Sequence, residues 1–328
     1  MSSSMHAIKI GDDNKATWST TDIPNIGPEE VLIKVHAAGI NRADLVQRSG
    51  NYPPPKGASP ILGLEVAGEV AELGAQVDSS KVTQGQKVCA LLTGGGYAEY
   101  AVVHHKLLLP VPKDFSMKMA AALPEVYFTA WLNLFMEANV QQGELALIHA
   151  GASGVGTAAI QLCKHFGVDT IATASESKLS NLTELGATHA LNRKDPEMFE
   201  QIKELSASHG GVDVILDPVA ANYLEGNISV LRLHGRMVLI GLMSGREANL
   251  NLGRLLIKRL KLIGSTLRSR PVEDKIAIAD QLREKVWPLF ESGELKPIID
   301  SSYPIQNTEE AHAKLASNTT TGKLILTL

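Results

Sequence analysis

One segment constrains the fold of this chain more than any other: an apolar strand that leads into a glycine-rich turn and then a helix. The strand covers Leu145 to His149, the turn contains Gly151, Gly154 and Gly156, and the helix covers Thr157 to Phe166. Glycines let the backbone turn sharply and approach a phosphate without an intervening Cβ, and a helix N-terminus adds unpaired N–H groups and a positive dipole end. The spacing differs from the usual G-x-G-x-x-G. Because a strand precedes the glycines and a helix follows them, we interpret the segment as a pyrophosphate-binding turn.

The sequence after this turn has the pattern of a parallel sheet. From about residue 125, short apolar runs alternate with segments of helical length, which is typical of βαβ units and of a doubly wound sheet. Helices are expected over 178–185, 196–207 and 272–290, the last with a kink at Pro288. The expected strands are 145–149, 170–174, 189–191, 212–216, 237–241 and 260–263.

The two ends of the chain have a different character. Val31 to Ala37 alternates like a strand, and glycines between positions 39 and 96 separate many short segments, as in a small β barrel or sandwich. Near the C-terminus, two strand-like runs, 297–300 and 323–328, flank a short helix expected over 308–316. We therefore expect an α/β protein. Its expected parts are a β-rich domain over 1–124, a dinucleotide-binding domain over 125–296, and a return to the first domain over 297–328.

Composition excludes several classes of protein. The 328 residues are 44% hydrophobic, which is enough for a sizeable core, and a formal net charge of −4 gives no general attraction for nucleic acid or an anionic membrane. Two cysteines cannot form a disulfide framework, and Met1 to Met5 lacks the features of a signal peptide. The uncharged stretch from Leu145 to Cys163 has the length of a membrane span, but its central glycines argue against one. We expect a cytoplasmic protein.

The end of the second strand of the predicted sheet bears on the choice of cofactor. An NAD-binding protein usually carries Asp or Glu there, against the ribose hydroxyls, whereas this chain has Thr173, Ala174 and Ser175. Ser175 and Lys178 suit a 2′-phosphate, with Arg193 as a second cation. These residues predict NADPH. Surface charges with no ligand remain the alternative, and Glu176 keeps NADH open.

Metal and nucleophile sites are not evident in the sequence. The histidines at 36, 104, 105 and 149 lack partner cysteines at useful spacing, and Cys89 is isolated in an apolar strand. Three or four converging ligands would be needed for zinc, so we expect no metal. Ser153 lies outside any nucleophile-elbow pattern. We interpret His149 as a core or turn residue rather than an acid.

Four motifs occur in order along the chain: Gly39 to Asp44, Gly50 to Pro55, Gly63 to Val70, and His149 to Gly156. Together they resemble the medium-chain dehydrogenase/reductase superfamily, and within it the zinc-free NADPH quinone oxidoreductases of the p53-inducible branch. The resemblance covers essentially the whole chain. It implies a GroES-like β-rich domain formed by both chain ends, with a Rossmann domain between them.

The resemblance also implies catalytic residues. In zinc-dependent members of the superfamily a cysteine stands in the place of Asn41 and a histidine in that of Leu64, so a metal-free site is implied here. Asn41 and Tyr52 are implied to lie beside the nicotinamide and the substrate. From the residues alone other roles stay open: Asn41 as the cap of a helix starting at Arg42, and Tyr52 as a packing anchor before three prolines.

The contacts of the cofactor follow from the same resemblance. The loop 150–156 is expected at the pyrophosphate, and Ser175 and Lys178 at the 2′-phosphate, with Arg193 in place of a usual tyrosine. Members of the superfamily commonly dimerise through the sixth strand, here 260–265. The full set of expected contacts is Thr129, Gly151, Ala152, Ser153, Gly154, Val155, Gly156, Ser175, Lys178, Arg193, Asp217, Gly241, Leu242, Met243, Leu267, Arg268 and Ser269.

The sequence thus predicts a zinc-independent, NADPH-dependent reductase that delivers a hydride, or single electrons, to a quinone. The cofactor carries the chemistry, and water or the Tyr52 hydroxyl supplies the proton. Two alternatives stay open: an alkenal or enoyl reductase on the same scaffold, and an NADPH-binding protein with a structural, sensing or RNA-binding role. Only the basic stretch 254–261 favours the last, and we interpret it as a solvated helix end. The expected partners are a small conjugated carbonyl compound and a second copy of the chain.

Overall fold

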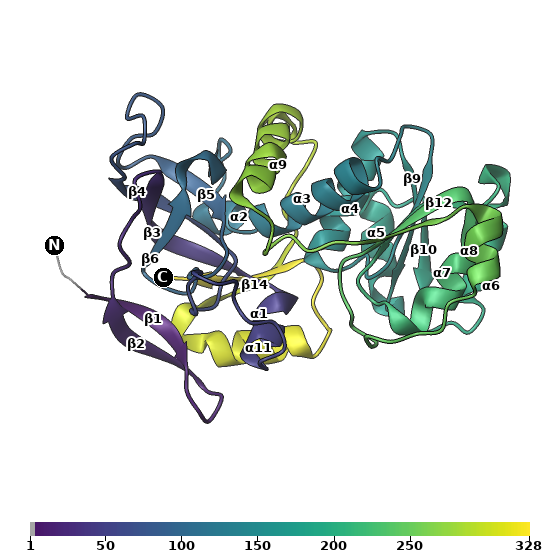
Figure 1. Ribbon diagram of the computed structural model, residues 1–328, viewed down its shortest axis with the longest axis horizontal. Helices are drawn as coiled ribbons and strands as arrows, with labels where there is room; N and C mark the ends of the chain where they lie inside the picture. Colours follow the sequence, from purple (N-terminus) through teal and green to yellow (C-terminus); the bar gives the residue numbers. More distant parts are fainter. Residues whose placement is uncertain (1–3) are drawn as a thin grey trace. The chain divides into compact units, whose positions relative to one another are not determined.

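A computed structural model describes residues 4–328 (Figure 1). Its internal contacts divide the chain into two compact units. The first contains the described residues up to Phe128 together with Leu267–Leu328, and the second is Thr129–Thr266. Residues 267–296, which we expect in the dinucleotide-binding domain, pack in the first unit, where Trp287 Nε1 donates to Pro110 O at 2.7 Å. The two units describe which residues pack together and do not test the domain limits expected from the sequence, which stay a prediction.

The second unit is built on a parallel six-stranded sheet, which confirms the doubly wound sheet expected from the sequence. The strand order is β10-β9-β8-β11-β12-β13, so the strand before the glycine turn lies in the middle. β12 begins at Leu231 rather than at residue 237 because the chain after α7 pairs with β11 from Val212 onward. The strands are β8 Leu145–Ile148, β9 Asp169–Ala174, β10 His189–Asn192, β11 Val212–Asp217, β12 Leu231–Leu239 and β13 Lys261–Gly264.

Apolar side chains on one face of this sheet form a core of the second unit. Leu147, Ile171, Ile215 and Met237 are register partners across neighbouring strands and are all buried in one cluster. Side chains two residues apart share a sheet face, so a row of apolar residues needs a helix to cover it. Met198 and Ile202 of α6 do this. The helices of this unit are α4 Gly154–His165, α5 Leu179–Leu185, α6 Met198–Leu205, α7 Leu224–Val230 and α8 Leu252–Lys258.

The first unit contains a seven-stranded sheet and a separate hairpin. The hairpin pairs β1 Ser4–Ile10 with β2 Ala16–Asp22. In the sheet the order is β14-β15-β3-β4-β5-β7, with β6 also paired to β3. The C-terminal strand β15 thus pairs with β3, so the end of the chain lies in the same sheet as residues 30–40. The strands are β3 Glu30–Ile40, β4 Glu65–Leu73, β5 Lys87–Leu91, β6 Tyr100–His104, β7 Leu108–Pro110, β14 Ile299–Pro304 and β15 Lys323–Thr327.

The helix expected over 272–290 is kinked, as predicted. It consists of α9 Val272–Lys285 and α10 Trp287–Glu291, and the break precedes Pro288, which lacks an N–H and clashes with the preceding turn. The other helices that carry or border the first unit are α1 Arg42–Arg48, α2 Met117–Ala120, α3 Pro124–Trp131 and α11 Thr308–Ala316. None of the helices within residues 4–328 has both the length and the apolar character needed to cross a bilayer.

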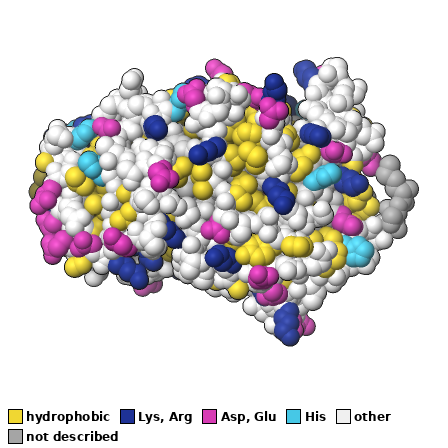
Figure 2. All heavy atoms as spheres, turned by 180° about the vertical axis from the view of Figure 1, so that it is seen from behind, with side chains coloured by type: hydrophobic (Ala, Val, Ile, Leu, Met, Phe, Trp, Pro, Cys, Tyr) yellow, Lys and Arg dark blue, Asp and Glu magenta, His cyan; other side chains and the backbone are white. Residues whose placement is uncertain are grey.

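Surface charge is mixed on the face shown in Figure 2, where Lys and Arg side chains lie scattered among Asp, Glu and uncharged side chains. The exposed large hydrophobic residues include three on α8: Leu252, Leu256 and Ile257 are 68%, 77% and 73% exposed. This helix immediately precedes β13, the edge strand of the parallel sheet. An edge strand beside exposed apolar side chains is a surface suited to pairing with another chain.

Candidate functional site

The glycine turn has the geometry of a phosphate cradle. Ser153 caps α4, and its Oγ accepts from Gly156 N at 3.0 Å, so the helix begins at Gly154, before the expected Thr157. A Cβ on Gly156 would lie 2.5 Å from Ala150 O and 2.6 Å from Gly151 O, which are backbone atoms that cannot swing aside. Only glycine fits at this position. The turn and the N–H groups of a twelve-residue helix suit the pyrophosphate of a dinucleotide.

The predicted cofactor contacts of the second unit gather at one edge of the sheet. Because β8, β9, β11 and β12 are parallel, the loops that follow them leave from the same carboxyl edge. These loops contain the glycine turn, Ser175 with Lys178, and the segment Gly241, Leu242 and Met243, and Asp217 is the last residue of β11 at the same edge. Leu242 and Met243 are each 55% exposed, as open contact surface would be. Thr129, at the start of the unit, is half-buried and accepts from Asn133 Nδ2 through its carbonyl.

Ser175 and Arg193 lie together at the end of β9. The Arg193 N–H donates to Ala174 O at 2.8 Å, and Arg193 Nε donates to Ser175 Oγ at 3.2 Å. Lys178 ends the short 3-10 turn that starts at Glu176. The Glu176 carboxylate, which kept NADH open in the sequence, accepts from Asn192 Nδ2 at 2.6 Å. The edge therefore combines a hydroxyl and two cations with an acid that is already hydrogen-bonded.

His149 belongs to a buried hydrogen-bond network, in agreement with its interpretation as a core residue. Its Nε2 pairs with Asn227 Oδ1 at 2.8 Å and its Nδ1 with Thr173 Oγ1 at 3.0 Å. Asn227 Nδ2 in turn donates to Asp217 Oδ2 at 3.0 Å, so its Oδ1 is the acceptor and His149 Nε2 carries the hydrogen. Burial lowers the pKa of His149, which keeps the ring neutral. Asp217 also accepts from Val219 N and thereby shapes the loop; its contact with a cofactor stays a prediction.

In the first unit, Asn41 is held by a buried ion pair that the sequence reasoning missed. Lys323 and Glu65 are 4% and 0% exposed, and Lys323 Nζ lies 2.5 Å from Glu65 Oε1. Lys323 Nζ donates to Asn41 Oδ1 at 2.6 Å, and Asn41 Nδ2 donates to Glu65 Oε1 at 2.9 Å. The three residues meet because β15 and β4 flank β3. The sequence did contain two signals, since Glu65 is an acid within the apolar third motif and Lys323 is the single charge of the run 323–328.

These contacts determine which way the Asn41 amide faces. An ammonium group only donates and a carboxylate only accepts, so Oδ1 must face Lys323 and Nδ2 must face Glu65. One hydrogen of Nδ2 bonds to Glu65, and no group within residues 4–328 accepts the other, which is left for a further acceptor. Asn41 does occupy the N-cap position of α1, where its backbone N–H donates to Asp44 Oδ2 at 2.7 Å. Its side chain, however, bonds to the ion pair.

Tyr52 and Arg268, also in the first unit, form a second contact group. The Arg268 guanidinium carbon lies 5.3 Å from the centre of the Tyr52 ring, and Arg268 Nε donates to Thr93 O at 2.7 Å. Arg268 is only 5% exposed, yet its Nη2 has no hydrogen-bond partner in the part of the chain that the structure describes. A buried N–H group without a partner suits a polar ligand atom. Its neighbours Leu267 and Ser269 are buried and exposed, respectively.

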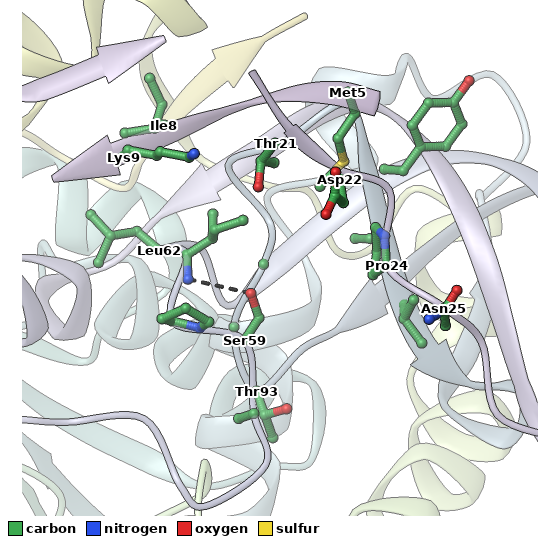
Figure 3. Close-up of a pocket in the computed structure, with 18 of the residues that line it drawn as sticks. Met5, Ile8, Lys9, Thr21, Asp22, Pro24, Asn25, Ser59, Leu62 and Thr93 are labelled. Atoms are coloured by element: carbon green, nitrogen blue, oxygen red, sulfur yellow. Dashed lines mark hydrogen bonds between the residues drawn. The ribbon is translucent and has the colours of Figure 1, made fainter. Parts of the chain in front are cut away.

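A pocket with a volume of about 770 Å³ lies within the first unit (Figure 3). Its walls come from the hairpin β1–β2 and from the loops 57–62 and 93–95. Thr93, which lines it, is the residue whose carbonyl accepts from Arg268. In the view of Figure 3, Met5, Thr21 and Asp22 lie on one side of the pocket and Ser59 and Thr93 on another. Both polar and apolar residues line the pocket, so its lining does not point to one class of ligand.

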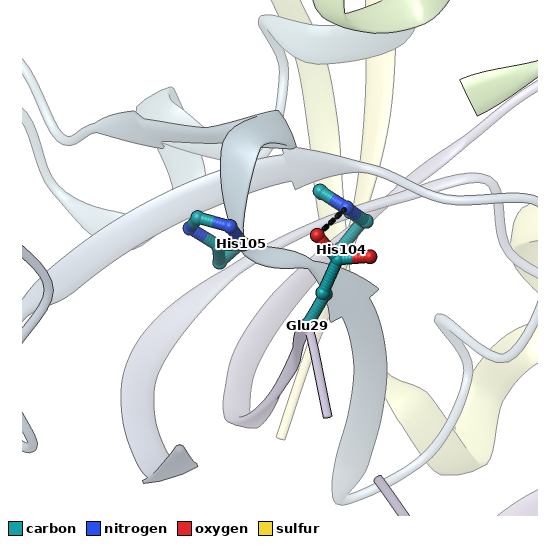
Figure 4. A group of neighbouring side chains, drawn as sticks. All are labelled: Glu29, His104 and His105. Atoms are coloured by element: carbon teal, nitrogen blue, oxygen red, sulfur yellow. Dashed lines mark ion pairs between the residues drawn. The ribbon is translucent and has the colours of Figure 1, made fainter. Parts of the chain in front are cut away.

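Three side chains with metal-ligating groups also lie together, which the search of the sequence missed (Figure 4). Glu29, His104 and His105 have ligand atoms within 4.8 Å of one another. They sit at the end of β3 opposite to Asn41, about 30 Å away for an eleven-residue strand. His104 Nδ1 accepts from Lys106 N at 3.2 Å, so a neutral ring carries its hydrogen on Nε2, the atom nearest Glu29. This arrangement suits a hydrogen-bonded pair of His104 and Glu29. The expectation that the catalytic site contains no metal stays a prediction.

Known proteins resemble this chain over its whole length. The alcohol dehydrogenase GroES-like domain model matches residues 27–113, and the zinc-binding dehydrogenase model matches residues 154–283. The quinone oxidoreductase of Sus scrofa is 33% identical, with 99% of this chain and 98% of that protein covered. The solved structure of the CurK enoyl reductase has a TM-score of 0.86 at 27% identity, with 99% of each chain covered. A mycobacterial protein complexed with NADPH has a TM-score of 0.85 at 28% identity, with 99% of this chain and 100% of that chain covered.

Proposed function

This chain belongs to the medium-chain dehydrogenase/reductase family, and we propose that it is an NADPH-dependent reductase of quinones that works without a metal. Family membership makes it an NAD(P)-dependent oxidoreductase with a small-molecule substrate. The observation that carries the finer proposal is the Asn41 amide, which Lys323 and Glu65 hold with one N–H left to donate. The name of the relative from Sus scrofa supports a quinone as the acceptor.

NADPH is proposed over NADH because of charge at the end of β9. A 2′-phosphate carries negative charge, and Arg193, Lys178 and the Ser175 hydroxyl are the groups at this position that favour it. The one nearby acid, Glu176, is hydrogen-bonded to Asn192. The NADPH complex of the mycobacterial relative supports the same choice.

The proposed role of the protein is to bind and orient. When bound, the nicotinamide supplies a hydride with its two electrons. The free N–H of Asn41 donates to the carbonyl oxygen of the acceptor, where negative charge develops, and a donor held by a buried ion pair needs no reorganisation. Tyr52, stacked under Arg268, offers an aromatic face for a planar acceptor. Because a quinone anion is stabilised by resonance, the hydride transfer itself needs little from the protein beyond such orientation.

An enoyl or alkenal reductase is the second candidate, and the likeness to the CurK enoyl reductase favours it. The same Asn41 donor would hold the carbonyl of an enone. One cation of the basic stretch that favoured a nucleic-acid-binding role is engaged within the protein. Lys258, within the basic stretch 254–261, donates to the carbonyls of Ile228, Ser229 and Leu231, so its ammonium group is occupied by the protein itself.

The proposed assembly is a homodimer formed by strand 260–265. β13 is the edge of the parallel sheet, and exposed apolar residues of α8 adjoin it in the sequence. Residues on an edge strand have unpaired backbone groups, which a second copy would satisfy. Light scattering of the purified protein measures this assembly directly. A cytoplasmic location stays a prediction from the cysteine content.

The test of function follows NADPH absorbance with purified protein and a panel of acceptors: 1,2-quinones, 1,4-quinones, alkenals and an enoyl thioester. Oxidation of NADPH by quinones supports the proposal, whereas oxidation by enones alone supports the second candidate. Binding of NADPH without turnover by any acceptor refutes both. The Gly156→Ala variant controls for contaminating reductases, because its Cβ would displace the turn.

A further inference from the structure

We propose that Glu125 is the proton donor of this reductase: its carboxyl group gives the proton that the acceptor takes up after reduction. The inference rests on the proposed function and deepens it. Neither a conjugated ketone nor a quinone is fully reduced by a hydride alone, since the resulting anion must still be protonated. The sequence left this proton to water or to Tyr52.

One carboxylate places Glu125 beside Asn41. Glu65 Oε1 accepts from Asn41 Nδ2 at 2.9 Å, and Glu65 Oε2 accepts from the Glu125 backbone N–H at 2.8 Å. Glu125 is the second residue of α3, so it is at the first turn of a helix. The residue that orients an acceptor and the residue proposed to protonate it are thus bound to the two oxygens of the same buried side chain.

The groups around Glu125 leave its carboxyl without a counter-charge of its own. Glu65 and Asp44 face it with negative charge, and Lys323 and Lys275 with positive charge. Both cations are committed elsewhere: Lys323 Nζ pairs with Glu65 Oε1, and Lys275 Nζ donates to Arg268 O at 2.7 Å. Within residues 4–328, no hydrogen bond or ion pair holds the Glu125 carboxyl.

Burial, reinforced by the neighbouring Glu65, raises the pKa of Glu125 to about 8. The acid is therefore protonated at neutral pH and available to donate. Burial and, to a lesser extent, the negative charge of ionised Glu125 raise the pKa of Tyr52, and the same charge opposes the lowering of the Arg268 pKa by burial, so the Glu125 carboxyl acts on both residues. Glu125 is half-buried, and an acid with a pKa near the working pH is what general acid catalysis requires.

The step is balanced as follows. The acceptor receives a hydride, with two electrons, and becomes an anion. The O–H bond of Glu125 breaks, and the proton forms an O–H bond on the quinone oxygen or a C–H bond on the α-carbon of an enone. Glu125 is left as a carboxylate, which the charges of Lys323 and Lys275 stabilise. Water returns a proton to it before the next cycle.

The first test observes the proton directly on the cofactor-free protein. Infrared difference spectra recorded between about pH 6 and pH 10 are expected to show the carbonyl band of a protonated carboxyl that disappears with a midpoint near pH 8. The band is expected to be missing from Glu125→Gln and retained in Glu284→Gln, a matched variant at an exposed position of α9. Equal spectra for the wild type and Glu125→Gln would overturn the proposal.

The second test measures single-turnover rates of acceptor reduction against pH. The wild-type rate is expected to fall above about pH 8, whereas Glu125→Gln is expected to be about 100-fold slower at pH 7, with no decline in that range and unchanged NADPH affinity. Gln resembles the protonated acid in shape and charge, so the fold is retained. Unchanged rates would refute the donor role. If the wild type reduced none of the acceptors, the proposed function would be refuted instead. The infrared spectra would still report whether Glu125 is protonated, because they need no acceptor.

Discussion

Replacing Lys323 by Met tests whether a buried ion pair holds the Asn41 amide. The change removes the ammonium from Glu65 Oε1 at 2.5 Å and Asn41 Oδ1 at 2.6 Å, and leaves Glu65 charged at 0% exposure. Loss of one partner of a buried pair costs about 3–5 kcal/mol of the free energy of unfolding. Two N–H donors, from Asn41 and Glu125, still reach Glu65, so we expect about 3 kcal/mol, the lower end of that range.

The measurement is denaturant unfolding of the cofactor-free protein at pH 7, with two reference variants. Lys203→Met breaks an exposed pair with Glu200, in which the side chains are 43% and 60% exposed, and is expected to cost less than about 1 kcal/mol. The double variant Lys323→Met with Glu65→Gln removes the stranded charge and is expected to recover much of the loss. An equal effect of Lys323→Met and Lys203→Met would refute the reasoning.

The same variant has an expected effect on activity. Without Lys323 only the contact with Glu65 still orients the Asn41 amide, so its Oδ1 loses its donor and the amide is held less firmly toward the acceptor. We expect kcat/KM for the acceptor to fall, while the affinity for NADPH stays unchanged because the dinucleotide contacts lie in other residues. Lys323→Arg keeps the charge and is expected to restore part of the activity. A loss confined to NADPH affinity would contradict this role.

Four further predictions follow from single sites. Gly156→Ala is expected to abolish dinucleotide binding, because the added Cβ would meet backbone oxygens at 2.5 and 2.6 Å. Gly151→Ala is expected only to weaken binding, because its Cβ would meet side chains at 3.1 Å. Calorimetric titration with NADPH distinguishes the two variants. Lys178→Ala is expected to weaken NADPH about tenfold and NADH hardly at all, and equal losses for both would exclude a 2′-phosphate contact. Asp44→Asn is expected to cost about 1–3 kcal/mol in thermal or denaturant unfolding, because the Asp44 carboxylate accepts from the backbone of Asn41 and Gly63 and from the Tyr97 hydroxyl, and an amide turns one acceptor into a donor. Folding raises the pKa of Glu125 from 4.5 to about 8, so the stability that its protonated carboxyl contributes is complete below pH 4.5 and is lost as the pH rises to about 8. The stability of Glu125→Gln relative to the wild type is therefore expected to increase over this range and to stay constant above it, and parallel pH profiles of unfolding would contradict this.

The sequence by itself determined the architecture of the second unit. Apolar period, segment length and glycine positions are local properties, and they identified the six parallel strands, the turn before α4 and the kink at Pro288. They also identified His149 as a core residue. The cations Lys178 and Arg193 could be named as candidate cofactor contacts because they follow strands whose ends must meet at one edge.

The tertiary structure decided the catalytic surroundings of Asn41. The sequence left open a helix cap or a catalytic amide, and contacts with Glu65 and with Lys323, 282 residues further along the chain, decided how that amide faces. Glu125 and the group of Glu29, His104 and His105 were likewise out of reach. The reason is physical: a strand pattern says that a strand forms, but the register and the order of strands, which arise from packing of the whole sheet, decide which distant side chains meet.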